Sequence, residues 1–343
     1  MSDLHKPLEY PFKPLEKNQR TALVEGIDAV RLSVPWALDH VNCWLIHEQE
    51  ASGSASTLID TGINNKATRA VWETLLDNAL PRRLLVTHYH PDHSGLSGWF
   101  QDQGVSCYSH ANEIDVMHEI WATSPEVYVQ EFSDWYTRHG LDETQVNQLS
   151  RVGHGYRATV AKLPVRNSWN ALSAGDEINL GGRQFEVLVG HGHAPSMLMF
   201  FCADEKLLIA ADQILPKISP NISVFPGTPD QNPLDSFLTS LDQFFRLPED
   251  TLVLPSHGEP FFGLHQRVRV LQEHHQERLD RLRNSCTVPM RAADVLSTLF
   301  ERKLDVQQTS FALGEAIAHL RYLVGEGEMV EHTESGTAFF SPA

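Results

Sequence analysis

The sequence predicts a layered α/β protein. Short apolar runs bounded by turn residues alternate along the chain with segments whose apolar residues recur at helical spacing. Four of these apolar runs end at histidine or aspartate residues, as expected where a rigid sheet carries a functional site at its edge. The chain has 343 residues, of which 41% are hydrophobic and 21% charged, so it can bury a sizeable core in one or two domains.

The first part of the chain is predicted to be an N-terminal arm over residues 1–20, followed by a sheet and one long helix. The helix spans residues 64–81; Asn64 or Asn65 caps its start and Pro81 closes it. The other elements expected here are strands over 29–35, 41–48, 56–62 and 82–87 and a short helix that ends near Gly104.

Residues 111–166 have a mostly helical pattern and many aromatic residues, and they are predicted to form a helical insertion over one edge of the fold. As a lid, their aromatic side chains would make an apolar pocket for an acyl chain or a ring. Packing of the helices onto the sheet explains the same side chains at least as well. The aromatic residues are Trp121, Tyr128, Phe132, Trp135, Tyr136 and Tyr156.

The second part of the chain returns to strands and ends in helices. Strands are expected over 182–190, 196–204, 206–212 and 251–256, with a helix over 234–246. A charged connector helix is expected over 263–284. Residues 285–343 are predicted to be helix, helix and hairpin over 291–301, 310–327 and 329–341.

Composition narrows the function and the location. The formal net charge of -17 disfavours nucleic-acid binding unless a local basic patch or bound metal offsets it. The four cysteines form no CxxC pair, and the N-terminus has no apolar segment of a secretory signal, so a reduced, cytoplasmic protein is expected. No apolar run is long enough to span a bilayer.

The stretch "THYHPDHSG", Thr87 to Gly95, carries the clearest chemical signal. It places three histidines and an aspartate within six residues, directly after an apolar run. Imidazole nitrogen and carboxylate oxygen are good ligands for Zn²⁺ and similar ions. A solvated loop that is histidine-rich by chance is the alternative, because the chain has 18 histidines.

Three other strand ends argue against chance. "FEVLVG" ends before His191 and His193, "KLLIAA" ends at Asp212, and "TLVLPS" ends at His257. Several separate strands thus supply the same small set of ligand types to one edge of the sheet. Packing alone does not predict this coincidence.

These motifs together resemble the metallo-β-lactamase superfamily. "THYHPDHSG" looks like its signature, "GHAPS" its second motif, "AADQIL" its bridging aspartate and "PSHGEPF" its last histidine. The resemblance covers roughly residues 20–262. It implies an αββα metallo-β-lactamase sandwich over 21–262, with a two-metal centre at one edge and the helical insertion at about 111–166.

The resemblance also implies the ligand set. One metal would be held by His88, His90 and His193; the other would be held by Asp92, His93 and His257; Asp212 would bridge the two. Asp92 and Asp212 are the expected catalytic residues. Ser196 departs from the glycine that the family often has there, and chemistry alone leaves His191 as a competitor of His193, although the following Ala-Pro favours His193.

Asp60, at the end of the strand "STLIDTG", is expected to hydrogen-bond one of the ligand imidazoles, with a turn-capping role as the alternative. Seven further histidines lack motif support and are expected at the surface or on helix faces. They are His110, His118, His139, His154, His265, His274 and His275.

The implied activity is hydrolysis by a metal-bridging hydroxide, since bound cations lower the pKa of water to about 7. Two divalent ions are expected, Zn²⁺ first, with Fe or Mn²⁺ as alternatives. The expected substrate is a thioester or ester, lactones included, of a small apolar-tailed molecule. The alternatives are a phosphodiesterase or endoribonuclease acting on single-stranded RNA and a non-catalytic metal-binding regulator.

Residues 285–343 resemble the winged-helix domain of one branch of the superfamily, which includes both an endoribonuclease and thioesterase-like enzymes. A helix that reads nucleic acid should be basic, but "SFALGEAIAHLRYLVGEG" carries one arginine and two glutamates before its end. A structural, pocket-completing or homo-oligomerising role is therefore favoured over nucleic-acid binding.

Overall fold

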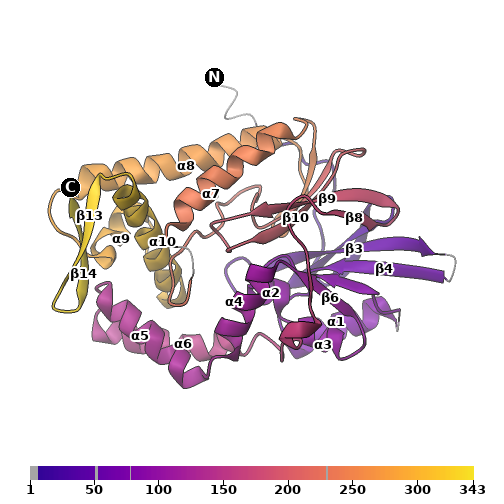
Figure 1. Cartoon of the computed structure of the whole chain (residues 1–343), viewed down its shortest axis with the longest axis horizontal. Coiled ribbons are helices and arrows are strands. Elements are labelled where there is room, and N and C mark those ends of the chain that lie inside the picture. The colour runs from indigo at the N-terminus through magenta and orange to yellow at the C-terminus, as the bar shows by residue number, and fades with distance from the viewer. Residues whose placement is uncertain (1–6, 51–52, 78, 229–230) are drawn as a thin grey trace.

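The computed structural model describes residues 7–50, 53–77, 79–228 and 231–343. Its centre is a pair of sheets that lie face to face between helices (Figure 1). The first sheet has the strand order β1–β2–β3–β4–β5–β6–β7 and the second β12–β11–β10–β9–β8. This is the αββα sandwich that the sequence predicts.

The first sheet follows the chain order. Its strands are β1 Gln19–Val24, β2 Ile27–Ser33, β3 His40–Glu50, β4 Gly53–Ile59, β5 Arg83–Leu85, β6 Ser106–Ser109 and β7 Asn170–Ala171. Strands β1 to β4 pair antiparallel, and β4 to β7 pair parallel. Strand β1 begins inside the expected N-terminal arm, because the short turn at Gly26 lets Gln19–Val24 fold back onto β2.

The second sheet is antiparallel except at one edge. Its strands are β8 Glu177–Leu180, β9 Arg183–Gly190, β10 Met197–Cys202, β11 Leu207–Ala211 and β12 Leu252–Pro255. Strands β11 and β12 pair parallel, so both end at the same edge. The parallel strands β4 to β6 of the first sheet end close to that edge too, and this brings the strand ends of both sheets together.

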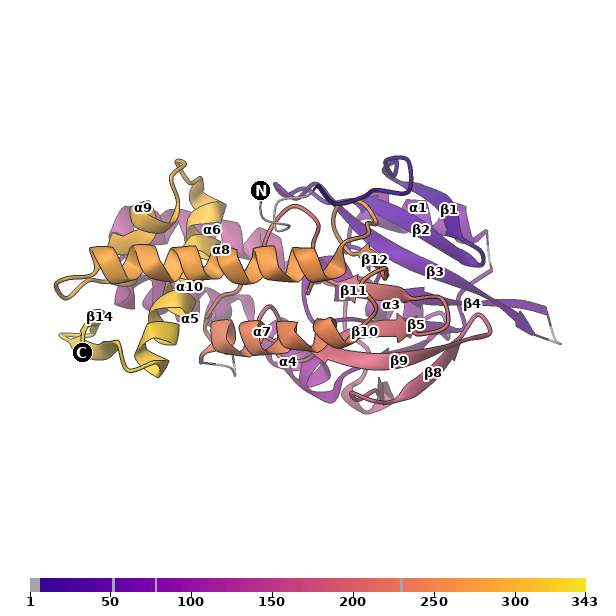
Figure 2. The ribbon, with the colours of Figure 1, turned by 90° about the horizontal axis from the view of Figure 1, so that it is seen from above.

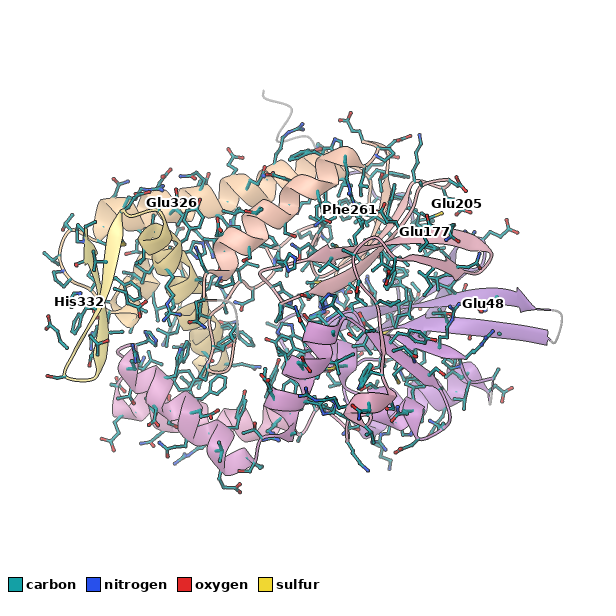
Figure 3. All side chains as sticks on the ribbon, viewed as in Figure 1. Glu48, Glu177, Glu205, Phe261, Glu326 and His332 are labelled. Atoms are coloured by element: carbon teal, nitrogen blue, oxygen red, sulfur yellow. The ribbon has the colours of Figure 1, made fainter. Side chains whose placement is uncertain are left out.

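Alternation along the strands builds three apolar layers. Trp44 and Ile46 of β3 point between the sheets, where they meet Leu198 and Phe200 of β10. The intervening Leu45 of β3 points outward into the layer beneath the helices. The side chains fill the space between the two sheets and below the covering helices (Figure 3).

The first sheet is covered by α1 Lys66–Leu76, α3 Ser97–Gln101 and α4 Ala111–Ala122. Asn65 is the N-cap of α1 and accepts a hydrogen bond of 2.8 Å from the Thr68 backbone N–H. The helix ends at Leu76 and not at Pro81, since Asp77 adopts a left-handed conformation with φ of 42° that stops it.

The second sheet is covered by α7 Pro233–Leu241 and α8 Leu264–Ser285, which lie along the same face (Figure 2). Helix α8 continues beyond the sheet to the C-terminal unit, which contains α9 Leu296–Leu299, α10 Val306–Gly325 and the hairpin β13 Met329–Glu334 with β14 Thr337–Pro342. The finer assignment of this unit as a winged helix stays a prediction. Helix α10 begins at Val306 because Asp305 and Gln308 form a capping box.

The helical insertion consists of α4, α5 Pro125–Arg138 and α6 Glu143–Arg157. Helix α10 lies between α8 and the α5–α6 pair (Figure 1). One apolar layer runs continuously from the outer face of the second sheet through α7 and α8 to Leu313, Ile317 and Leu320 of α10. The C-terminal unit is thus packed into the sandwich and does not have a separate core.

Candidate metal centre

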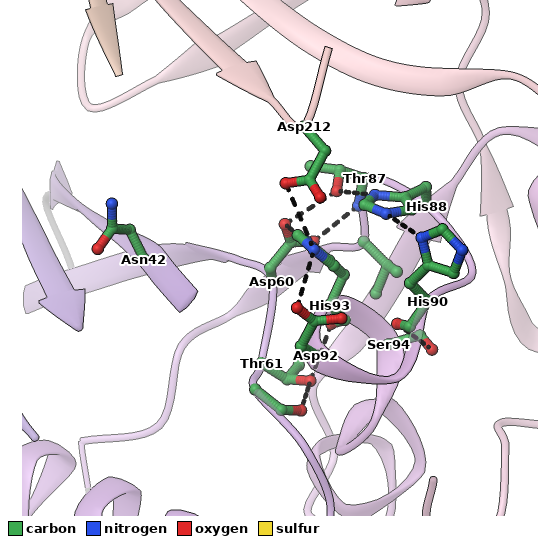
Figure 4. A network of polar contacts seen from close by, with 12 residues as sticks. Asn42, Asp60, Thr61, Thr87, His88, His90, Asp92, His93, Ser94 and Asp212 are labelled. Carbon is green, nitrogen blue, oxygen red and sulfur yellow. Dashed lines mark hydrogen bonds and ion pairs between the residues drawn. The ribbon is translucent and has the colours of Figure 1, made fainter. Parts of the chain in front are cut away.

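The seven residues predicted as ligands lie together where strands of both sheets end. His88 follows β5, and His90, Asp92 and His93 lie on or next to the short helix α2 Pro91–Ser94 (Figure 4). The other three come from the second sheet, with His193 after β9, Asp212 directly after β11 and His257 directly after β12.

Three overlapping groups of side chains have all their ligand atoms within 4.8 Å of one another. Asp212 lies close to histidines from both sheets. Its carboxylate oxygens are 3.6 Å from His93 Nε2, which the first sheet supplies, and 3.4 Å and 3.3 Å from His193 Nε2 and His257 Nε2, which the second sheet supplies. The groups are His88, His90 and His193; His88, His93 and Asp212; and Asp92, His93 and His257.

The histidine rings are oriented through the nitrogen that faces away from the centre. His193 Nδ1 donates to the Asn221 carbonyl at 2.8 Å, and His257 Nδ1 donates to the His40 carbonyl at 2.6 Å. A carbonyl only accepts hydrogen bonds, so in both rings Nδ1 carries a proton and Nε2 is the nitrogen that faces the centre, where it can bind a metal when it is deprotonated. Both partners are backbone atoms, which explains why no side-chain type in the sequence indicates them.

Asp60 orients His93 directly and His88 through Thr87, in the hydrogen-bonding role expected from the sequence. Its Oδ2 accepts hydrogen bonds from His93 Nδ1 at 2.7 Å and from the Thr87 hydroxyl at 2.8 Å, and its Oδ1 accepts the Thr87 backbone N–H at 2.8 Å. The Thr87 hydroxyl, having donated to Asp60, can accept from His88 Nδ1 at 3.0 Å. Asp60 itself has a left-handed backbone with φ of 62°, and so does Ala211 next to Asp212, with φ of 46°. Backbone strain of this kind is typical of functional sites.

The donor set fits divalent cations. Nε2 of His93, His193 and His257 and Oδ1 of Asp212 are buried and have no hydrogen-bond partner. Buried polar atoms are otherwise nearly always paired in proteins, so such a group of orphans is explained by a bound ion. Five imidazoles and two carboxylates match the nitrogen and oxygen preference of Zn²⁺ and related metals.

The charges of the centre also favour a cation. Burial and the neighbouring histidines hold the pKa of His88 and of His90 well below the usual value, so both imidazoles are neutral and able to bind a metal at pH 7. Burial would raise the pKa of Asp92, but His93 and His257 outweigh it and lower the value to about 2. The same two histidines, against the effect of burial, hold the pKa of Asp212 well below its usual range. Two ionised carboxylates thus face one small space, and against the effect of burial they raise the pKa of His93 to about 9 and that of His257 to about 10, so a bound cation would take the place of the protons on these two rings.

Glu113 is a further buried acid that sequence reasoning missed. Its carboxylate accepts the Tyr89 backbone N–H at 2.9 Å and the Ser196 backbone N–H at 2.6 Å, and it therefore joins the loop of the first motif to that of the second. Ser196, the departure from the family pattern, lies in this junction. The available signal was one acidic residue on the buried face of a helix, next to Ile114, Val116 and Met117.

The other histidines have different surroundings. His191 is exposed, hydrogen-bonds the Pro195 carbonyl at 2.6 Å and belongs to none of the described groups of ligand atoms. His139 and His275 are buried, whereas surface or helix-face positions were expected. His275 sits between the Ser219 hydroxyl at 3.0 Å and His319 at 3.1 Å, where α8 packs on α10. The side chain of His154 is outside the described residues.

A cavity of about 250 Å³ adjoins the centre at Tyr89 and His90. Five of the six aromatic residues of the insertion line it; the sixth, Trp135, instead packs against Phe225 with ring centroids 5.6 Å apart. The loop 225–228 and helix α10 supply the opposite wall. The five aromatic residues are Trp121, Tyr128, Phe132, Tyr136 and Tyr156.

Comparison with known protein families gives two matches along the chain. Residues 36–257 match the metallo-beta-lactamase superfamily, and residues 279–343 match the metallo-beta-lactamase-like C-terminal domain. None of the described helices is long and apolar enough to cross a membrane.

Two individual proteins are similar over nearly the whole chain, and a third is similar over part of it. A crystal structure of a beta-lactamase domain protein from Burkholderia ambifaria is 35% identical, covers 98% of both chains and superposes with a TM-score of 0.88. The Probable metallo-hydrolase YqjP of Bacillus subtilis is 27% identical over 92% of this chain and 98% of its own length. Hydroxyacylglutathione hydrolase of Ruegeria pomeroyi is 32% identical over 36% of this chain and 47% of its own length.

Proposed function

The chain belongs to the metallo-beta-lactamase superfamily and is a metal-dependent hydrolase, and we propose that it cleaves a thioester or ester, lactones included, with an apolar acyl group. Bound divalent cations would lower the pKa of a coordinated water toward about 7 and polarise the scissile carbonyl. The proposed ligands are His88, His90 and His193 for one ion, Asp92, His93 and His257 for the other, and Asp212 between them.

The observation that carries the proposal is the cavity beside His90. The described residues that line it include eight tyrosine, phenylalanine and tryptophan side chains and no lysine or arginine. An apolar pocket of this kind binds an acyl chain or ring and offers nothing to a phosphate. The net charge of -17 acts in the same direction.

A relative supports the thioester part of the proposal. The protein from Ruegeria pomeroyi is named for the hydrolysis of hydroxyacylglutathione, and a glutathione acylated at sulfur is a thioester. The similarity covers 36% of this chain and 47% of that relative.

The residues of this chain have separable roles in the proposal. Asp92 and Asp212 are the proposed catalytic carboxylates; His93 and His257 keep them ionised against the effect of burial, so that they can hold cations and accept hydrogen bonds. Asp60, and the carbonyls of His40 and Asn221, orient the imidazoles. We propose Zn²⁺ because imidazole nitrogen dominates the donor set.

We also propose a division into an arm to residue 20, a catalytic domain over 21–262 and a winged-helix-like domain over 285–343.

The test is thiol release from a panel of acyl thioesters by metal-replete protein. We expect turnover in the wild type, loss of at least about a thousandfold in Asp212→Ala, and wild-type turnover in Asp250→Ala, which removes an exposed aspartate paired with Lys206. Metal content measured on the same samples shows that the ions are bound. Absence of release from every thioester by metal-loaded protein contradicts the proposal, and cleavage of single-stranded RNA or phosphodiesters would then identify the alternative.

A further inference from the structure

Helix α10 of the C-terminal unit forms one wall of the cavity that begins at His90. Gln307, Ser310 and Phe311, all in its first two turns, line the same space as Tyr89 and His90. The Ser310 hydroxyl lies 2.7 Å from the Tyr136 hydroxyl of α5, so the insertion and the C-terminal unit meet across the cavity. Phe311 contacts Phe225 at 6.1 Å between ring centroids and closes the aromatic wall.

The position of α10 depends on a glycine inside the helix. A Cβ atom at Gly314 would lie 2.8 Å from Ser223 Cβ and 3.0 Å from Phe225 Cε1. The Val224 backbone N–H donates to the Gly314 carbonyl at 3.2 Å. Glycine in a helix interior is less favourable than alanine, so its use here is explained by this close approach to the loop.

The same loop connects α10 to the candidate metal centre. Ser223 Oγ lies within hydrogen-bonding distance of the Phe311 carbonyl, at 3.3 Å, and of Asn221 Oδ1. The backbone carbonyl of Asn221 accepts the hydrogen bond that orients His193. Three hydrogen bonds thus link a helix from the last part of the chain to a candidate ligand.

The charged side chains that line the cavity are acidic, whereas the Arg157 guanidinium, which is not among the lining residues, lies 5.9 Å from the Tyr128 ring centroid and donates to the Trp121 carbonyl at 2.7 Å. Glu119 and Glu131 line the cavity and are exposed. The other described lining residues include no aspartate, lysine or arginine, and the one histidine among them, His90, is a proposed metal ligand. A carboxylate on the acyl group would meet negative charge at the rim and an apolar wall inside, and both disfavour an anion.

We infer that α10 is the end wall of an acyl pocket and that the pocket selects uncharged acyl groups, with Phe311 setting the length or width that fits. This inference rests on the proposed function, since it assigns the acyl part of the substrate to the cavity. Because an apolar cavity of about 150 Å³ accepts benzene, a cavity of about 250 Å³ has room for a substituted ring or a chain of about eight carbons.

The experiment compares N-acetylcysteamine thioesters of straight-chain acids from butanoyl to dodecanoyl, together with ω-carboxy acyl groups of equal length. In the wild type we expect kcat/KM to rise about fourfold for each methylene buried and to fall once the chain reaches α10. An ω-carboxylate should lower kcat/KM by at least about tenfold, and Glu131→Gln should recover part of that loss.

Two variants change the end wall in opposite directions. Phe311→Ala should raise the ratio of dodecanoyl to octanoyl kcat/KM by at least about tenfold. Gln307→Trp fills the wall without opening a hole and should lower the same ratio, so it serves if Phe311→Ala fails to fold. Phe339→Ala is the matched control: it removes a phenyl ring from the same C-terminal unit, on β14, where the ring stacks on His332 outside the cavity.

Binding of S-(2-oxoalkyl) thioethers is measured by calorimetry, because these compounds mimic the thioesters but cannot be hydrolysed. The measurement tests the acyl pocket separately from the proposed hydrolase activity. Binding that follows chain length and shifts in Phe311→Ala, without hydrolysis of any thioester, supports the pocket and refutes the proposed function. Hydrolysis with the same chain-length profile in wild type, Phe311→Ala and Gln307→Trp supports the function and overturns the assignment of α10. An equal shift in Phe339→Ala also overturns it.

Discussion

Replacing Asp60 by asparagine should disable the centre by changing one atom. Asp60 accepts three hydrogen bonds, two from Thr87 and one from His93 Nδ1. The asparagine oxygen can keep the bond from the Thr87 backbone, but its amide nitrogen then faces His93 Nδ1 and can only donate. His93 must then accept at Nδ1 and carry its proton on Nε2, which removes the lone pair that faces the centre. The opposite amide orientation places two donors against each other at Thr87.

The size of the effect follows from the burial of this network. Asp60 is 1% exposed and His93 is fully buried, so water cannot replace the lost acceptor. Changes of this kind in groups that orient a ligand weaken metal binding by about 10- to 100-fold, which is about 1.4–2.7 kcal/mol. The metal-free protein should lose about 1–3 kcal/mol of unfolding free energy, because a buried donor lacks its acceptor.

The assay is competition for Zn²⁺ with a chromophoric chelator at constant pH, with urea unfolding of the metal-free protein measured separately. Asp250→Asn, the same chemical change at an exposed aspartate, should leave both quantities unchanged. A folded Asp60→Asn protein that binds Zn²⁺ within twofold of the wild type would refute the tautomer argument.

Three other outcomes are expected. Saturating metal should raise the melting temperature by about 5 °C relative to chelated protein, because it satisfies the orphaned histidine and aspartate atoms; equal melting temperatures would contradict the fit of the donor set. Burial raises the pKa of Glu113 to about 7 from the ordinary 4.5. The unfolding free energy of the wild type should therefore fall by up to about 3 kcal/mol as pH rises from about 4.5 through 7, and that of Glu113→Gln should fall less, as measured by urea unfolding at each pH. The same pH dependence in both proteins would show that Glu113 does not titrate in this way. Asn42 is fully buried, accepts Arg31 Nε at 2.9 Å and donates to the carbonyls of Pro255 and Gly258 on either side of His257, each at 2.9 Å. Asn42→Ala should therefore cost at least about 2 kcal/mol in urea unfolding and lower turnover, and full turnover would show that the loop holds His257 without it.

A layered α/β protein with ligand-type residues at its strand ends could be anticipated because those signals are local, whereas the αββα sandwich and the full set of seven ligands were implied by the family resemblance. An apolar run followed by a histidine or aspartate predicts both a strand and a possible metal ligand at its end, as at His88 and Asp212. The orienting partners are different, since Asn221 and His40 act through backbone carbonyls that any residue would supply. The end of α1 was misplaced because a left-handed Asp77 is not distinguishable by residue type from an ordinary helical aspartate.

The aromatic insertion shows a second limit of sequence patterns. Tyr128 and Trp135 have the same character in the sequence, yet one lines the cavity and the other packs behind it against Phe225. That difference depends on where the loop 225–228 lies, some ninety residues further along the chain. Likewise, the contribution of α10 to the cavity depends on the approach at Gly314 and not on any ligand-like motif.

The contact between Gly314 and the loop beside Asn221 also has a consequence for the order of events during synthesis. A chain that has emerged from the ribosome as far as His257 already contains every candidate ligand, but the helix that supports the Asn221 loop has not yet been made. Because α8 and α10 also cover the outer face of the second sheet, a chain cut after His257 would hold all seven candidate ligands but leave that apolar layer uncovered and the Asn221 loop unsupported.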